Sequence, residues 1–117
     1  NAQIATLLQS VYIWTSTDPY ANSNNIYVLL TRFGGRLKNS FNGHLGHLIS
    51  TRTNISGGIA WIEVLCFPYN SGDSSGPYAV SVIDTMNRAF PIYSWTTFVL
   101  CHEMGHNVGS PHTHNCF

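Results

Sequence analysis

The feature that most constrains this chain is the run His-Glu-Met-Gly-His-Asn-Val-Gly-Ser-Pro-His at positions 102–112. Each residue of an α-helix turns the chain by about 100°, so residues four positions apart lie about 40° apart around the axis. His102 and His106 therefore project from one face of a helix and can bind the same metal ion. The run predicts a helix at this place with a metal site on it.

A third metal ligand is expected from the turn that follows the helix. A catalytic zinc ion takes three protein ligands and keeps one position open for water. The third ligand cannot come from the same straight helix, so the chain must turn after His106. Gly109 can adopt the left-handed conformation that ends a helix, and Pro111 prevents the helix from resuming. We therefore expect His102, His106 and His112 to bind one zinc ion.

Glu103 adjoins the first histidine and points about 100° away from it around the helix. Its carboxylate is expected to lie beside the metal, within reach of a zinc-bound water. Zinc lowers the pKa of such a water towards 7 and polarises a carbonyl, while the glutamate takes the proton and passes it to a leaving amine. The prediction is peptide-bond hydrolysis with Glu103 as the general base and no covalent intermediate. A histidine cluster that only caps helix carbonyls is the alternative, but it does not account for Glu103, Gly109 and His112 together.

The other histidines and the tryptophans have more ordinary interpretations. His114 stands at an irregular offset from the run, which favours a surface role over metal binding. His44 and His47 lie near a predicted strand, where a lone histidine is usually a hydrogen-bonded structural residue. The three tryptophans recur at strand and helix spacing and are expected in the core, not in a carbohydrate-binding platform.

The chain has three cysteines, so at most one disulfide can form within it and at least one thiol has no internal partner. The sequence does not decide how Cys66, Cys101 and Cys116 pair. Cys101 precedes the first histidine in an apolar segment, which favours a small buried hydrophobic residue over a redox switch. A structural zinc site completed by Cys116 is an alternative to the site with three histidines.

Composition and charge limit the classes of protein to which this chain can belong. Residues 1–117 are long enough for a single domain with one core. A content of 44% hydrophobic and only 9% charged residues is not typical of disordered proteins. Five basic residues balance five acidic ones, so neither nucleic acid nor membrane is expected as a partner. No apolar run reaches the roughly 20 residues that span a bilayer. Polar residues that are mainly Ser, Thr and Asn are typical of exported proteins, so a secreted, extracellular protein is expected.

The first third of the chain predicts two helical segments and a strand. Residues 2–8 look like the end of a helix, and the aromatic and β-branched run 11–15 predicts a strand. Apolar residues then recur at helical spacing over 26–37, with Asn24 or Asn25 placed to cap the first turn. This pattern indicates an amphipathic helix.

The remaining pattern predicts three strands and a second helix. The strands are expected over 45–50, 59–66 and 78–83, with a turn-forming glycine pair at 57–58. The active-site helix is expected over about 94–108, with Ser94 as its N-cap. The order strand, helix, three strands, helix indicates an α+β domain with a mixed sheet packed against two helices.

The zinc-binding run and several further segments resemble the metzincin metallopeptidases, most closely the reprolysin (adamalysin) type that occurs in bacteria. The further segments are His-Leu-Ile-Ser at 47–50, Gly-Gly-Ile-Ala-Trp-Ile-Glu-Val-Leu-Cys at 57–66, Tyr-Ser-Trp at 93–95 and Thr-His-Asn-Cys at 113–116. The resemblance implies a secreted zinc endopeptidase with a zincin-like fold. It also implies that the strand over 58–65 is the sheet edge above the cleft, where an extended substrate peptide adds antiparallel through main-chain hydrogen bonds.

The chain departs from the metzincin pattern in two features. Metzincins place a methionine turn beneath the zinc after the third histidine, whereas Met86 and Met104 both precede His112. Reprolysins usually carry Asp directly after that histidine, and this chain has Thr113. We therefore expect the 117 residues to be the amino-terminal part of a longer catalytic domain, with the lower subdomain missing.

The functional expectation is a monomeric, zinc-dependent endopeptidase that cleaves proteins or peptides bound along residues 58–65. A rival from another class is a secreted interaction module that binds zinc and is catalytically silent. The missing lower subdomain is what makes this rival a serious alternative.

Overall fold

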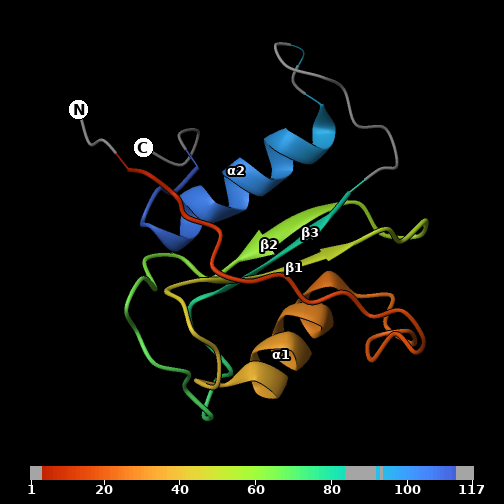
Figure 1. The fold of residues 1–117 in the computed structure, drawn as a ribbon, viewed down its shortest axis with the longest axis horizontal. Coiled ribbons are helices and arrows are strands. Elements are labelled where there is room, and N and C mark those ends of the chain that lie inside the picture. Colours follow the sequence, from red (N-terminus) through yellow and green to blue (C-terminus); the bar gives the residue numbers. More distant parts are fainter. Residues whose placement is uncertain (1–3, 84–91, 93, 113–117) are drawn as a thin grey trace.

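The structure, a computed structural model, describes residues 4–83, 92 and 94–112 (Figure 1). Helix α1 (Ile26–Leu37) and helix α2 (Trp95–Asn107) lie on opposite sides of one sheet. The sheet consists of β1 (Gly46–Ser50), β2 (Gly57–Ala60) and β3 (Tyr78–Val82). The predicted α+β class, a mixed sheet packed against two helices, is confirmed. Predictions that fell on Met86, Thr113, His114 and Cys116 lie outside the described residues.

β3 is the middle strand, and its two neighbours run in different directions. β1 is parallel to β3, with Gly46 opposite Tyr78. β2 is antiparallel to β3, with Gly58 opposite Ser81. Every residue of β3 is buried, while β1 and β2 each pair with only one strand among the described residues. β2 is therefore an edge strand in this part of the chain.

Helix α1 begins at a capped turn. The side chain of Asn25 accepts hydrogen bonds from the N–H groups of Tyr27 and Val28, at 2.9 and 3.4 Å. These bonds satisfy amide groups that have no carbonyl partner in the first turn of a helix. Of the two caps that the sequence predicted, Asn24 and Asn25, the structure selects Asn25.

The main core lies between α1 and the sheet. Its aromatic rings meet edge-on, with Phe33 against Tyr78 at 5.9 Å between centroids. Gly34 lets the helix approach the sheet closely, because a Cβ there would lie 2.9 Å from the Tyr78 ring. The buried members of the cluster are Tyr20, Leu29, Leu30, Phe33, Leu48, Tyr78 and Val80. This packing fixes β3, and α2 contacts the same strand.

The predicted strand over residues 11–15 is wrong, and so is the helical segment predicted over 2–8 for the part that the structure describes, residues 4–8. Residues 4–17 contain neither helix nor strand, and no backbone hydrogen bond joins them to another described residue. Trp14 is held by its ring, which packs edge-on against Tyr20 at 5.8 Å between centroids. An apolar, β-branched run forms a strand only where a neighbouring strand can take up its main-chain groups.

β2 is shorter than the predicted edge strand over 58–65, because the chain leaves the sheet to meet the end of α2. The N–H of Glu63 donates to the carbonyl of His106 at 2.9 Å. The N–H of Val64 donates to the carbonyl of Asn107 at 3.0 Å. Glu63 also has a φ of 56°, a left-handed conformation outside strand geometry. The second half of the predicted strand therefore caps a helix.

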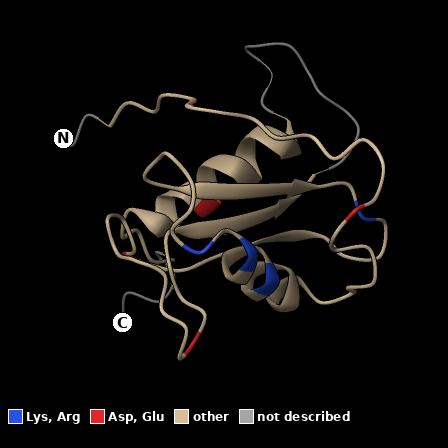
Figure 2. Ribbon diagram, turned by 60° about the horizontal axis from the view of Figure 1, so that its bottom comes forward, with Lys and Arg blue, Asp and Glu red and all other residues tan. Residues whose placement is uncertain are grey.

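Charged residues are few and scattered over the part of the chain that the structure describes (Figure 2). Arg52 pairs with Asp18 at 3.0 Å between nitrogen and oxygen, which ties the segment after β1 to the loop before α1. Glu103 in α2 differs from the other described acidic residues, because its side chain is 4% exposed. No described helix is long and apolar enough to cross a bilayer.

His47 in β1 is hydrogen-bonded across the sheet. Its Nε2 lies 2.7 Å from Oγ of Ser81, which is fully buried in β3. Burial lowers the pKa of His47 from 6.5 to about 4, because the charged ring loses solvation there. The prediction of a hydrogen-bonded structural histidine is therefore confirmed for His47. His44, for which the same role was expected, is exposed.

His47 is predicted to make the protein less stable as the pH falls. Between pH 6.5 and about 4 the unfolded chain takes up a proton at this residue and the folded chain does not, so stability decreases towards acid. From about pH 7 to pH 4 the wild type should lose on the order of 3 kcal/mol more than His47→Gln. Chemical denaturation across this pH range measures the difference, with His44→Gln as the exposed control. Identical pH dependence in the wild type and His47→Gln would contradict the prediction.

Candidate metal centre

Helix α2 begins at the predicted cap. The side chain of Ser94 accepts a hydrogen bond from the N–H of Thr97 at 3.3 Å, and its carbonyl accepts one from the N–H of Phe98 at 3.1 Å. The prediction of Ser94 as N-cap is therefore confirmed. The helix then continues without a break through His102 and His106, which lie on consecutive turns.

α2 has one buried face and one exposed face. Trp95 and Phe98 are 43% and 58% exposed, and Cys101 is also exposed. The predictions that Cys101 and Trp95 are buried are therefore wrong, because the described chain covers only the side of α2 that faces the sheet. Trp14 and Trp61, in contrast, pack against the core as predicted. The buried residues of α2 are Val99, Glu103, His106 and Asn107.

The chain turns back directly after α2. Gly109 has a φ of 101°, a conformation that glycine adopts without steric cost, and its N–H donates to the carbonyl of His106 at 2.9 Å. The N–H of Ser110 donates to the carbonyl of Gly105 at 2.9 Å. These bonds close the helix end around a left-handed residue. The turn brings His112 back beside α2.

Asn107 joins α2 to the sheet, a role that the sequence analysis did not assign. Its side chain is fully buried, and Nδ2 donates to the carbonyls of Trp61 at 2.8 Å and Tyr78 at 3.0 Å. The end of β2 and the start of β3 are thus tied to the residue that follows His106. A lone asparagine in a sequence gives no sign of such a contact, which depends on the three-dimensional fold.

His102, His106 and His112 meet through their Nε2 atoms. The Nε2–Nε2 distances are 3.0, 3.1 and 3.1 Å. Three nitrogens at this separation cannot all be hydrogen-bonded to one another, since each bond needs one proton directed at one lone pair. Nδ1 of His106 lies 2.6 Å from the carbonyl oxygen of Ser110 and donates to it, so Nε2 of the neutral ring carries a lone pair. The three nitrogens lie close enough together to hold one metal ion.

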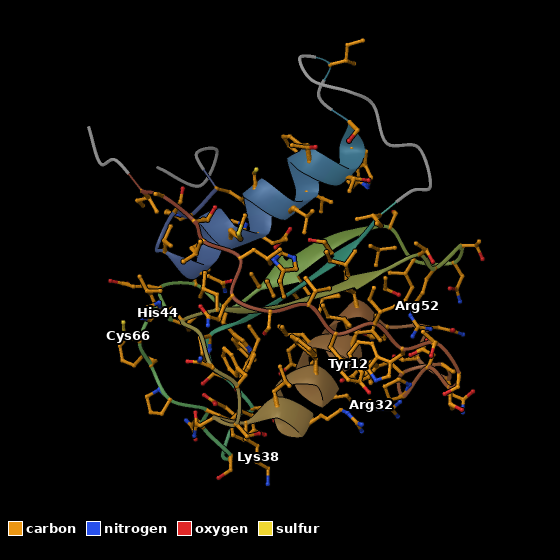
Figure 3. All side chains as sticks on the ribbon, viewed as in Figure 1. Tyr12, Arg32, Lys38, His44, Arg52 and Cys66 are labelled. Atoms are coloured by element: carbon orange, nitrogen blue, oxygen red, sulfur yellow. The ribbon has the colours of Figure 1, made fainter. Side chains whose placement is uncertain are left out.

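The remaining described histidines do not belong to this cluster. His47 is bonded to Ser81 within the sheet. His44 precedes β1 and, together with Cys66, borders a surface pocket between two loops (Figure 3). Cys66 and Cys101 form no disulfide within the described part of the chain.

Glu103 lies between α2 and β2. A Cβ on Gly58 would come within 2.6 Å of Cδ of Glu103, so the carboxyl group rests directly on the backbone of the edge strand. Burial raises the pKa of Glu103, and the neighbouring His106 lowers it by a smaller amount. The residue pattern predicted a turn at the glycine pair 57–58, and the resemblance placed Gly58 in the edge strand; both glycines belong to β2, so the turn is wrong and the strand assignment of Gly58 is confirmed. A glycine that faces a bulky helix residue is the signal that would have identified this contact.

The surroundings of His102 favour its neutral ring. Burial lowers the pKa of His102, and the charges that His106 and His112 carry when protonated lower it further. Metal ions bind the neutral imidazole, so a proton competes less strongly for this ligand than for an exposed histidine.

The model of a reprolysin family, described as metallo-peptidase family M12, matches residues 1–117. The chain belongs to metallo-peptidase family M12. No curated protein and no solved structure matches it. The family assignment confirms the resemblance to the reprolysin-like metzincins, and the small mixed sheet with two helices agrees with a zincin-like domain.

The residues of the M12 chain fit the zinc ion that the family implies. Zinc binds imidazole nitrogen at about 2.0–2.1 Å, so tetrahedral ligands lie about 3.3 Å apart. The Nε2 atoms of the cluster are 3.0–3.1 Å apart and already face one another. The bond from His106 to the carbonyl of Ser110 is of the kind that orients a ligand ring. The sulfur ligand considered at Cys116 lies outside the described residues.

Gly58→Ala is expected to act through Glu103. The added methyl group would overlap the glutamate side chain, and overpacking of this kind costs about 1–3 kcal/mol. Chemical unfolding should show this loss in the wild-type background and little of it in a Glu103→Ala background. Gly43→Ala is the control, because its Cβ would meet the Phe41 ring at an ordinary 3.6 Å. An equal loss in both backgrounds would show that Gly58 is not packed against Glu103.

Proposed function

We propose that this M12 chain is a zinc-dependent endopeptidase that hydrolyses internal peptide bonds. The observation that supports it most is one cluster of three imidazole Nε2 atoms within 3.1 Å of one another, two of them from α2, the helix that also carries the buried carboxyl group of Glu103. His102, His106 and His112 would hold the metal. Zinc, when bound, supplies a Lewis acid that lowers the pKa of a coordinated water and polarises the scissile carbonyl.

Glu103 is the proposed general base. It follows His102 directly in α2, and its packing against Gly58 holds the carboxyl group between the helix and β2. Because burial raises its pKa, the ionised carboxylate is a stronger base than that of an exposed glutamate. In the proposed reaction Glu103 takes a proton from the attacking water and returns it to the leaving amine nitrogen.

The proposed substrate is a protein or peptide segment bound in extended form along β2. The outer side of β2 has no strand partner within the described residues, and all four of its residues are half-buried. Gly58 lies in this strand and contacts Glu103, so a peptide added to the edge would pass close to the proposed base. Main-chain hydrogen bonds would hold it antiparallel, with little dependence on its sequence.

We also propose that the protein acts outside the cell as a monomer. The support for the first part is a composition poor in charge, in which Ser, Thr and Asn replace the usual Lys and Glu. Fractionation of producing cells tests the first part and light scattering the second. Protein retained inside the cells, or a stable dimer, would contradict the respective part.

One zinc ion per chain is expected, and the ligand histidines should each be required for it. His102→Ala, His106→Ala and His112→Ala should each lose most of the bound zinc, because two imidazoles are too few for a stable site. Elemental analysis of folded protein measures the content, with His44→Ala as the control at an exposed position. Full zinc content in His112→Ala would exclude it as a ligand.

Glu103→Gln should keep the zinc and the fold and lose nearly all turnover, since an amide cannot accept the proton of the attacking water. Removal of a general base typically costs about 10²–10⁴-fold in rate. Cleavage of an unstructured protein substrate, with a chelator control, measures the loss, and Glu63→Gln serves as the matched control at an exposed glutamate. Unchanged cleavage by Glu103→Gln would exclude the role. Zinc binding without turnover in the wild type would favour a silent zinc-binding module.

A further inference from the structure

We infer that Phe98 is a positioning residue that orients the zinc ligand His102 by ring stacking. The inference rests on the proposed function, because it concerns how the same site holds its metal. Phe98 lies one helical turn before His102 in α2, and the ring centroids are 5.8 Å apart with an angle of 27° between the planes. Side chains four residues apart in a helix meet in this way, so the contact follows from the helix itself.

The stacking contact is part of a longer column of rings. Trp95 lies against Phe98 at 5.8 Å and 32°, and its indole N–H donates to the carbonyl of Val82 at 3.2 Å. His102 in turn stacks on His112 at 5.0 Å and 28°. The column therefore starts at a ring anchored to the end of β3 and continues to two of the proposed ligands.

Two of the ligand rings are oriented by different means. His106 donates from Nδ1 to the carbonyl of Ser110, which fixes its ring plane. For His102, no hydrogen bond to Nδ1 is found within the described residues, and its neighbours are flat rings. The χ2 torsion of histidine has only broad minima of its own. The stacks with Phe98 and with His112 therefore restrict the rotation that would move Nε2 of His102 out of the cluster, and Phe98 is the one of the two that is not itself a proposed ligand.

A role in orienting His102 also explains why Phe98 is exposed. Its side chain is 58% exposed, so it adds little to the hydrophobic core. A residue placed for stability alone would be buried against the sheet, as the neighbouring Val99 is. Removing the ring should therefore alter metal binding more than it alters folding. An aromatic pair contributes an amount that corresponds to about a two- to tenfold change in an equilibrium constant.

The test compares zinc affinity in Phe98→Leu, Phe98→Met and Phe98→Tyr with that of the wild type. Leu and Met keep apolar volume without a flat face, while Tyr keeps the ring and is the matched control. Competition with a chromogenic chelator gives the zinc affinity, unfolding of the metal-free protein gives the stability, and the visible spectrum of the cobalt form reports ligand geometry. We expect zinc to bind about two- to tenfold more weakly to the Leu and Met variants, and within about twofold of the wild type to Phe98→Tyr.

The inference is overturned if Leu and Met bind zinc as tightly as the wild type, or if Tyr binds as weakly as they do. It is also overturned if the metal-free Leu and Met variants lose stability in proportion to their loss of zinc affinity, because Phe98 would then act through the fold. A change confined to the KM of a peptide, with zinc affinity unchanged, would place Phe98 against the substrate instead. These results leave the proposed function standing, whereas a wild type that binds no zinc contradicts the proposed function itself.

Discussion

Two main-chain carbonyls and one buried amide attach the C-terminal end of α2 to the sheet, and the geometry of the histidine cluster depends on that attachment. The carbonyls of His106 and Asn107 accept from the chain after β2, and the Asn107 side chain donates to the carbonyls of Trp61 and Tyr78. The helix end is thereby closed by protein groups, since its last carbonyls have no partners within the helix. His106 is part of this attachment, and His112 follows the turn directly after it. Both side chains are therefore fixed relative to the sheet.

The parts of the structure that could be predicted from the sequence are those that depend on neighbours along the chain. Ser94 and Asn25 cap their helices through groups two or three residues away, and a spacing of four places His102 and His106 on one face. The turn at Gly109 likewise needs only the local backbone. The α+β class followed from the order of such local elements.

The parts that could not be predicted depend on contacts between distant segments. The run 11–15 has strand composition, but no described strand takes up its main-chain groups. The predicted edge strand ends early because Glu63 and Val64 bond to the end of α2, a contact that nothing in their own segment indicates. Cys101 was expected to be buried because it is a cysteine in an apolar segment, whereas the described chain covers only the opposite side of α2. Gly58 supports Glu103 only because α2 crosses β2 at that residue.

The buried carboxyl group gives β2 a second role besides pairing with β3. No side chain separates Gly58 from Glu103, so the backbone of the edge strand limits the space that the carboxyl group can occupy. The same chain segment continues into the residues that cap α2, and it can therefore extend the sheet edge only as far as Ala60. A short edge offers few main-chain hydrogen bonds to an added peptide, and burial of Glu103 without an ionic partner raises its pKa. A dication bound to the three histidines would favour the ionised carboxylate, so the proposed base and the proposed metal site depend on each other electrostatically.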